Sequence, residues 1–253
     1  MKPLSEFINR ILCADARAVL SDLPNESIDL ILTDPPYGDN ISYGPRKVRI
    51  PGNDHPLLAL EVLHSAYRLV KRNTAAYMFC GMRHLPFVRA FFAQYTRYRL
   101  RDVLIWDKVT MGVGYGFRKQ YECILALEKG RPSYRNSGML NLLSYRKVRD
   151  GSHPHAKPLP LLKALIAHSS NQGGVVLDPF LGSGATALAA KHLGRKYIGI
   201  EVNPVYCRIA ANRLRQPMLP LIRNCTEPQS HPVAIPSLAA ISATPSRLQK
   251  PVW

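Results

Sequence analysis

Two turns define this chain: DPPYG at residues 34–38 and DPFLGSGAT at residues 178–186. Each follows a short apolar stretch, 28–32 (interrupted by Asp29) and 175–177, with the composition of a buried β-strand. Both turns are therefore expected where a strand of an α/β sheet ends. Open α/β sheets bind their ligands at such strand ends, so we expect both turns to bind ligands.

The pattern outward from these turns alternates strands with helices. We predict strands at 10–13, 28–33, 75–80, 101–106, 121–127, 174–177 and 196–200, and helices at 16–23, 57–70, 85–95, 158–169, 185–193 and 204–214. This alternation favours an α/β fold with a doubly wound, mainly parallel sheet of the Rossmann-like type.

Three regions follow from this pattern. Residues 1–215 are predicted to form one domain, inside which 129–155 is a basic, loop-like insertion. From 216 to 253 repeated prolines and the lack of sustained periodicity predict a tail.

The charge balance points to a polyanionic partner. Thirty-four Lys and Arg residues against seventeen Asp and Glu residues give a net charge of +17, which favours binding to phosphates. A generally basic, soluble surface is the alternative, and charge does not separate DNA from RNA.

The sequence gives no sign of a secreted, membrane-spanning, disulfide-bonded or metal-binding protein. We find no signal-peptide pattern and no apolar stretch approaching the ~20 residues that span a bilayer. The five cysteines are scattered, as in reduced cytosolic proteins. His153 and His155 form the one close histidine pair, without the cysteine or carboxylate cluster of a metal site, so we predict no metal.

The second turn has the features of a nucleoside site. Gly182 and Gly184 allow a sharp turn and a close ligand approach. Glu201 ends the next predicted strand 23 residues after Asp178, close to the ~20-residue interval at which an acid meets ribose hydroxyls. The turn lacks both GxGxxG and a phosphate-loop lysine, which favours a nucleoside without a pyrophosphate. A plain strand–turn–helix is the structural alternative.

The first turn suits an exocyclic amine on a planar base. The carboxylate of Asp34 and a carbonyl, that of Pro35, can accept the two N–H bonds, which frees the nitrogen lone pair. Pro35 and Pro36 fix the backbone and supply no competing donors. Tyr37 offers a face on which the base can stack. A rigid Pro-Pro loop is the alternative.

With these motifs in this order, residues 10–215 resemble the beta-class amino-methyltransferases of DNA, which use S-adenosylmethionine and place the DPPY tetrad before the DPF-x-GSG turn. The resemblance includes Trp106-Asp107-Lys108, Tyr121-Glu122 and Tyr206. It implies a circularly permuted motif order, catalysis by Asp34, Pro35, Pro36 and Tyr37, and no metal. The cofactor-binding residues that it implies are Asp15, Ala16, Lys157, Asp178, Phe180, Gly182, Ser183, Gly184, Thr186, Glu201 and Asn203. Ala185 departs from the threonine common in that family.

The region in which the family recognises its target is short and basic here. Long cationic side chains mostly position phosphates, so we expect short or relaxed sequence specificity. The predicted nucleic-acid contacts are Arg46, Lys47, Arg49, Lys119, Arg131, Arg135, Arg146, Lys147 and Arg149.

The resemblance favours methylation of adenine N6 in DNA, with the base flipped out of the helix. Cytosine N4 is the close alternative, although members that act on it more often carry Ser in place of Asp34. RNA or protein-amide methyltransferases, and a catalytically idle nucleic-acid-binding protein, fit the motifs less well. We expect a cytoplasmic monomer or homodimer of the bacterial restriction–modification or prophage kind, acting on DNA without a membrane.

Overall fold

The computed structural model describes residues 1–36, 57–110, 116–136, 138–147 and 157–216. Contacts divide the chain into two compact units, Met1–Met218 and Leu219–Trp253, and the second lies outside the described residues. The domain limits taken from the sequence, including the tail, therefore stay a prediction.

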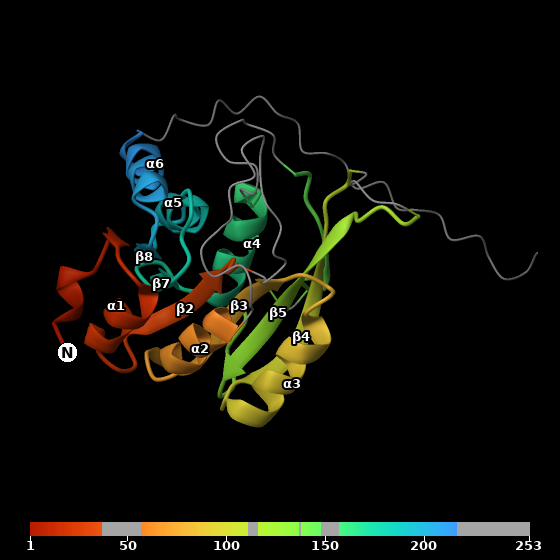
Figure 1. Ribbon diagram of the computed structural model, residues 1–253, viewed down its shortest axis with the longest axis horizontal. Coiled ribbons are helices and arrows are strands. Elements are labelled where there is room, and N and C mark those ends of the chain that lie inside the picture. Colours follow the sequence, from red (N-terminus) through yellow and green to blue (C-terminus); the bar gives the residue numbers. More distant parts are fainter. Residues whose placement is uncertain (37–56, 111–115, 137, 148–156, 217–253) are drawn as a thin grey trace, which may run out of the picture. The chain divides into compact units, whose positions relative to one another are not determined.

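The first unit is built on an eight-stranded mixed sheet (Figure 1) with the order β1-β8-β7-β2-β3-β5-β4-β6. The strands are β1 (Arg10–Cys13), β2 (Ile28–Thr33), β3 (Val70–Cys80), β4 (Arg99–Asp107), β5 (Tyr121–Lys129), β6 (Leu142–Ser144), β7 (Val175–Asp178) and β8 (Lys196–Glu201). Only β5 runs against its neighbours, β3 and β4. The predicted mainly parallel sheet is confirmed.

Helices cover both faces of this sheet. Figure 1 shows α1 (Ala16–Asp22), α2 (Leu57–Ala66) and α3 (Leu85–Tyr95) on one face, and α4 (Leu159–Ser169), α5 (Ala185–His192) and α6 (Pro204–Arg215) on the other. A short 3₁₀ helix, Leu4–Glu6, precedes β1. Alternate residues of β2 divide between the two cores: Ile31 packs toward α1 and α2, while Leu30 and Leu32 pack toward α4. Burial on both faces explains the nearly continuous apolar sequence of this strand.

Three sequence-based assignments are wrong. The strand predicted over 75–80 begins five residues earlier, since β3 spans Val70–Cys80. The helix predicted to reach residue 70 ends at Ala66, because the carbonyl of Leu69 accepts bonds from Ser27 and Ile28, and Val70 pairs with Ile28 in the sheet. The insertion predicted as loop contains β6, whose buried Leu143 pairs with Trp106 of β4 in the sheet. A strand of three residues is too short to leave a periodic signal.

The directions of the strands show at which edge of the sheet the two turns lie. The carboxyl ends of β1, β8, β7, β2 and β3 meet at one edge, here called the carboxyl edge. The antiparallel β5 begins at this edge, since Cys123 pairs with Cys80, and it ends at the opposite edge, where Lys129 pairs with Thr74. Within the described residues, no helix is long and apolar enough to cross a membrane.

Gly184 provides a test of how the turn before α5 packs. Its φ is +85°, and a Cβ there would lie 2.8 Å from the Cβ of Ala210 on α6. Gly184→Ala should lower the free energy of unfolding by roughly 2–4 kcal/mol, through left-handed strain and overpacking. Gly194→Ala is the control, because its φ is +69° but no atom lies within 4 Å, so strain alone costs roughly 1 kcal/mol. Equal losses in urea unfolding would contradict this packing role.

Candidate active site at the carboxyl edge

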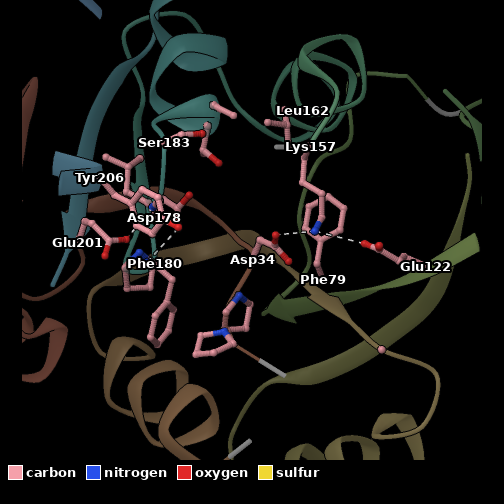
Figure 2. A pocket seen from close by; sticks show the side chains of 18 of the residues that line it. Asp34, Phe79, Glu122, Lys157, Leu162, Asp178, Phe180, Ser183, Glu201 and Tyr206 are labelled. Atoms are coloured by element: carbon pink, nitrogen blue, oxygen red, sulfur yellow. Dashed lines mark hydrogen bonds and ion pairs between the residues drawn. The ribbon is translucent and has the colours of Figure 1, made fainter. Parts of the chain in front are cut away.

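A cavity of about 790 Å³ opens at the carboxyl edge, and both turns line it. Asp34, Pro35 and Pro36 come from the turn after β2, and residues 178–183 come from the turn after β7 (Figure 2). Their strands are neighbours in the sheet. This volume is in the range of small-molecule sites.

A buried lysine joins the first turn to the middle of the sheet. Lys157 Nζ lies 2.5 Å from Asp34 Oδ2 and 3.2 Å from Glu122 Oε2, and its side chain is 9% exposed (Figure 2). The other oxygen of Glu122, Oε1, lies 2.7 Å from Lys108 Nζ. The Lys157 ammonium also lies 4.9 Å from the centre of the Phe79 ring. Two ammonium groups thus alternate with two carboxylates.

Lys157 and Glu122 stabilise each other's charged form. Burial lowers the pKa of Lys157, but the carboxylates of Asp34 and Glu122 outweigh this effect and leave the pKa above its ordinary value. For Glu122 the signs are reversed: burial raises the pKa, but the positive charges of Lys157 and Lys108 together have the larger effect and lower it to about 2. Both side chains are therefore charged at neutral pH.

The second turn holds a carboxylate at the cavity wall. Gly182 has a φ of +55°, and no atom lies within 4 Å of the place where its Cβ would stand, so this backbone can be approached closely. Its N–H donates to Glu201 Oε2 at 2.8 Å, and the N–H of Asn203 donates to Oε1 at 2.8 Å. The Glu201 carboxylate is therefore fixed in orientation before any ligand binds.

Asp178 is a buried carboxylate between the two turns. Its Oδ1 accepts from Thr33 Oγ1 at 2.7 Å and from the N–H of Phe180 at 3.0 Å. Burial raises the pKa of Asp178 to about 6, although its hydrogen bonds, including one with Thr186, favour the ionised form. This pKa places a protonation change of the cavity wall near neutral pH.

Most of the cofactor-binding residues predicted from the sequence line this one cavity. They are Asp15, Ala16, Lys157, Asp178, Phe180, Gly182, Ser183, Thr186 and Glu201. Asp15 also caps α1, where its carboxylate accepts from the N–H of Arg17 at 2.8 Å. Two predicted residues are not part of the lining: Gly184 packs against α6, and the side chain of Asn203 caps α6 through the N–H of Val205.

The predicted nucleic-acid contacts separate into two groups. Lys119 lines the cavity, and Arg146 and Lys147 follow β6 at the carboxyl edge, where the N–H of Lys147 donates to the carbonyl of Lys108. Arg131 and Arg135 lie at the opposite edge, because their N–H groups donate to Asn73 Oδ1, near the start of β3, and to the carbonyl of His168, near the end of α4. Tyr37, Arg46, Lys47, Arg49 and Arg149 lie outside the described residues.

Some residues at the site received no role from the sequence. Thr33 is not part of the cavity lining, but it donates to Asp178, and the sequence gave no signal for it. Lys108, Glu122 and Tyr206 stood in the motifs of the resemblance without an assigned role, and that resemblance was the signal that marked them. Phe117 lines the cavity with its side chain 97% exposed. Among the described residues, no group of His, Cys, Asp and Glu could hold a metal ion.

The raised pKa of Asp178 predicts a pH-dependent stability. The folded protein binds this proton more tightly than the unfolded chain, in which the pKa is 3.8. The stabilisation is therefore complete below pH 3.8 and is lost as the pH rises through about 6. Asp178→Asn should remove a slope of up to about 1.4 kcal/mol per pH unit within this window, measured by urea unfolding from pH 4 to 7 without ligands. If the free energy of unfolding changed with pH in the same way in the variant and the wild type, the raised pKa of Asp178 would be wrong.

The comparisons with known proteins agree with this arrangement. A family model described as DNA methylase matches residues 28–149 and 135–212. Type II methyltransferase M.HpaI of Haemophilus parainfluenzae is 30% identical over 81% of this chain and 74% of its own length. Putative methylase YubD of Escherichia coli K12 is 32% identical over 82% and 90%, and DNA adenine methyltransferase YhdJ of the same strain is 29% identical over 81% and 82%.

Solved structures share the fold. The crystal structure of the M1.HpyAVI–SAM complex matches with a TM-score of 0.64 and 27% identity, and covers 81% of this chain and 98% of that chain. The cytosine-N4-specific PvuII DNA methyltransferase matches with a TM-score of 0.69 at 17% identity over 83% and 87%, a likeness of fold alone. The family match, the relatives and the cavity built by both turns lead to one conclusion: this chain belongs to the DNA methylase family.

Proposed function

We propose that this protein transfers a methyl group from S-adenosylmethionine to the exocyclic N6 amine of adenine in DNA. The single observation that carries the proposal is the cavity in which the Asp34 turn faces the glycine turn and Glu201. This arrangement supports the proposal, because an amine acceptor and a nucleoside site would then share one cavity. Family membership and the net charge of +17 support DNA as the substrate.

The residues at the second turn fit this cofactor. The open space beside Gly182 admits a ligand against the backbone. The Glu201 carboxylate has acceptor capacity beyond the two N–H groups that hold it, enough for ribose hydroxyls. Phe180 and Tyr206 add aromatic surface to the same wall. The relative solved with SAM supports the same assignment.

The chemistry that we propose is direct transfer. When bound, S-adenosylmethionine supplies an electrophilic methyl group: the amine lone pair forms the N–C bond, the C–S electron pair stays on sulfur, and the methylated amine releases one proton to solvent. Asp34 and the carbonyl of Pro35 accept the N–H bonds of the amine and so localise its lone pair. The protein contributes mainly position and exclusion of water, since the target base is flipped out into the cavity.

Adenine is favoured over cytosine on two grounds. The tetrad begins with Asp34, where members acting on cytosine N4 more often carry serine. The relative YhdJ is named a DNA adenine methyltransferase. Cytosine N4 remains the second candidate, because its amine presents the same chemical problem and the PvuII enzyme shares the fold.

The purified protein, unmethylated DNA and methyl-labelled S-adenosylmethionine test the proposal directly. We expect N6-methyladenine in the nucleosides of the digested DNA, and single-molecule sequencing should place it in a short or degenerate context. N4-methylcytosine would establish the second candidate instead. DNA that stays unlabelled, with no detectable binding of the cofactor, would overturn the proposed function.

Asp34→Ala tests the amine acceptor. We expect methyl transfer to fall by roughly a hundredfold or more, because the group that orients the amine in the transition state is lost. Cofactor affinity, measured by calorimetry, should change little. Asp29→Asn is the control, since Asp29 stands at the other end of β2 and pairs with Lys71 at 2.8 Å. Near-normal turnover of Asp34→Ala would exclude the proposed role.

The separation of the basic residues predicts which of them bind DNA. Replacing Lys119 and Arg146 together by Ala should reduce the slope of log affinity against log salt concentration by about 2, since each phosphate contact contributes about 0.9. The same change at Arg131 and Arg135 removes equal charge from the opposite edge and should leave the slope nearly unchanged. Binding assays at several salt concentrations would measure both, and equal effects would contradict this placement of DNA.

A further inference from the structure

The alternating positive and negative side chains at the cavity are arranged across neighbouring strands of the sheet. Asp34 follows β2, Glu122 belongs to β5, and Lys108 follows β4. In the sheet, β3 lies between β2 and β5, and its Phe79 ring lies beneath the Lys157 ammonium. The Lys157 side chain therefore bridges the width of β3 and joins two carboxylates that β3 holds apart (Figure 2).

We infer that Glu122, acting through Lys157, is a positioning residue for Asp34. Lys108 holds Glu122, Glu122 holds the Lys157 ammonium, and the ammonium keeps the Asp34 carboxylate in one orientation. The inference rests on the proposed function, in which Asp34 accepts the target amine. It adds a role for three charged residues that stand outside the tetrad.

The electrostatics support this assignment. A carboxylate is attracted to a cation within ~4–6 Å, so the ammonium restrains the position of the Asp34 Oδ2 atom that it contacts. The Lys157 side chain is 9% exposed, so its charge is stabilised mainly by nearby carboxylates and not by water. The groups that face it include Asp34, which follows β2, Glu122 from β5 and Phe79 from β3, with Lys108 on the far side of Glu122.

The sign of the coupling follows from these charges. Glu122 raises the pKa of Lys157, so Glu122→Gln, which keeps the shape and removes the charge, must lower it. Lys157 would then lose its proton at a lower pH, and Asp34 would lose its cationic partner there. Lys108→Gln acts in the opposite direction, because it removes a positive charge that opposes the protonation of Lys157.

Two measurements test the inference. The ¹³Cε resonance of Lys157 reports its titration without any need for activity; we expect it to move to lower pH in Glu122→Gln and to higher pH in Lys108→Gln. In the transfer assay, the alkaline limb of the kcat profile of Glu122→Gln should move to lower pH. Its maximal kcat should fall roughly ten- to a hundredfold with cofactor affinity nearly unchanged, as for a displaced catalytic group.

Glu128→Gln is the matched control. Glu128 lies on the same strand, is 2% exposed and pairs with Arg99, but it stands at the opposite edge of the sheet. It should leave both the Lys157 titration and the alkaline limb where they are in the wild type.

Distinct outcomes separate the two proposals. A Lys157 titration that is the same in the wild type, Glu122→Gln and Lys108→Gln would overturn the inference, and so would an alkaline limb that stays in place while the titration moves. A wild-type protein that transfers no methyl group would overturn the proposed function, and with it the positioning role, whatever the NMR titration shows.

Discussion

The hydrogen bond from Thr33 Oγ1 to Asp178 Oδ1, 2.7 Å long, joins two strand ends that are 145 residues apart in the chain. It ties the end of β2 to the end of β7, the two strands from which the turns of the site emerge. Because this bond is buried, losing the Asp178 carboxylate would leave the Thr33 hydroxyl without this acceptor at the carboxyl edge. Together with the pairing of β2 and β7, the bond sets the relative position of the two turns and hence the shape of the cavity.

The charges at the cavity are balanced, whereas the chain as a whole carries a positive excess. The chain carries a large positive excess, yet the alternating groups at the cavity (Lys108, Glu122, Lys157 and Asp34) sum to zero. A neutral set of this kind can be buried because each charge has an opposite partner within hydrogen-bonding distance. The excess positive charge remains available to a polyanion at the surface.

Two glycines of one turn illustrate how a motif combines separate physical requirements. Both have positive φ, but Gly182 faces open space at the cavity, whereas Gly184 allows α5 to approach Ala210 on α6. One glycine thus makes room for a ligand and the other for a helix. The sequence predicted that both glycines contact the ligand. A motif shows which residue types occur at a turn, but it does not show which atoms lie next to each of them.

The sequence by itself determined the α/β class, nearly all strands and helices, and the two turns, because buried strands and glycine turns are local patterns. It also identified most of the residues that line the cavity. Only the tertiary structure decided that Lys157 contacts Asp34 and Glu122, because that contact depends on β3 lying between β2 and β5. The antiparallel direction of β5 likewise carries Arg131 and Arg135 away from the cavity, while β6 returns Arg146 to the carboxyl edge. Pairing between distant strands sets these positions, and no local pattern of residues encodes them.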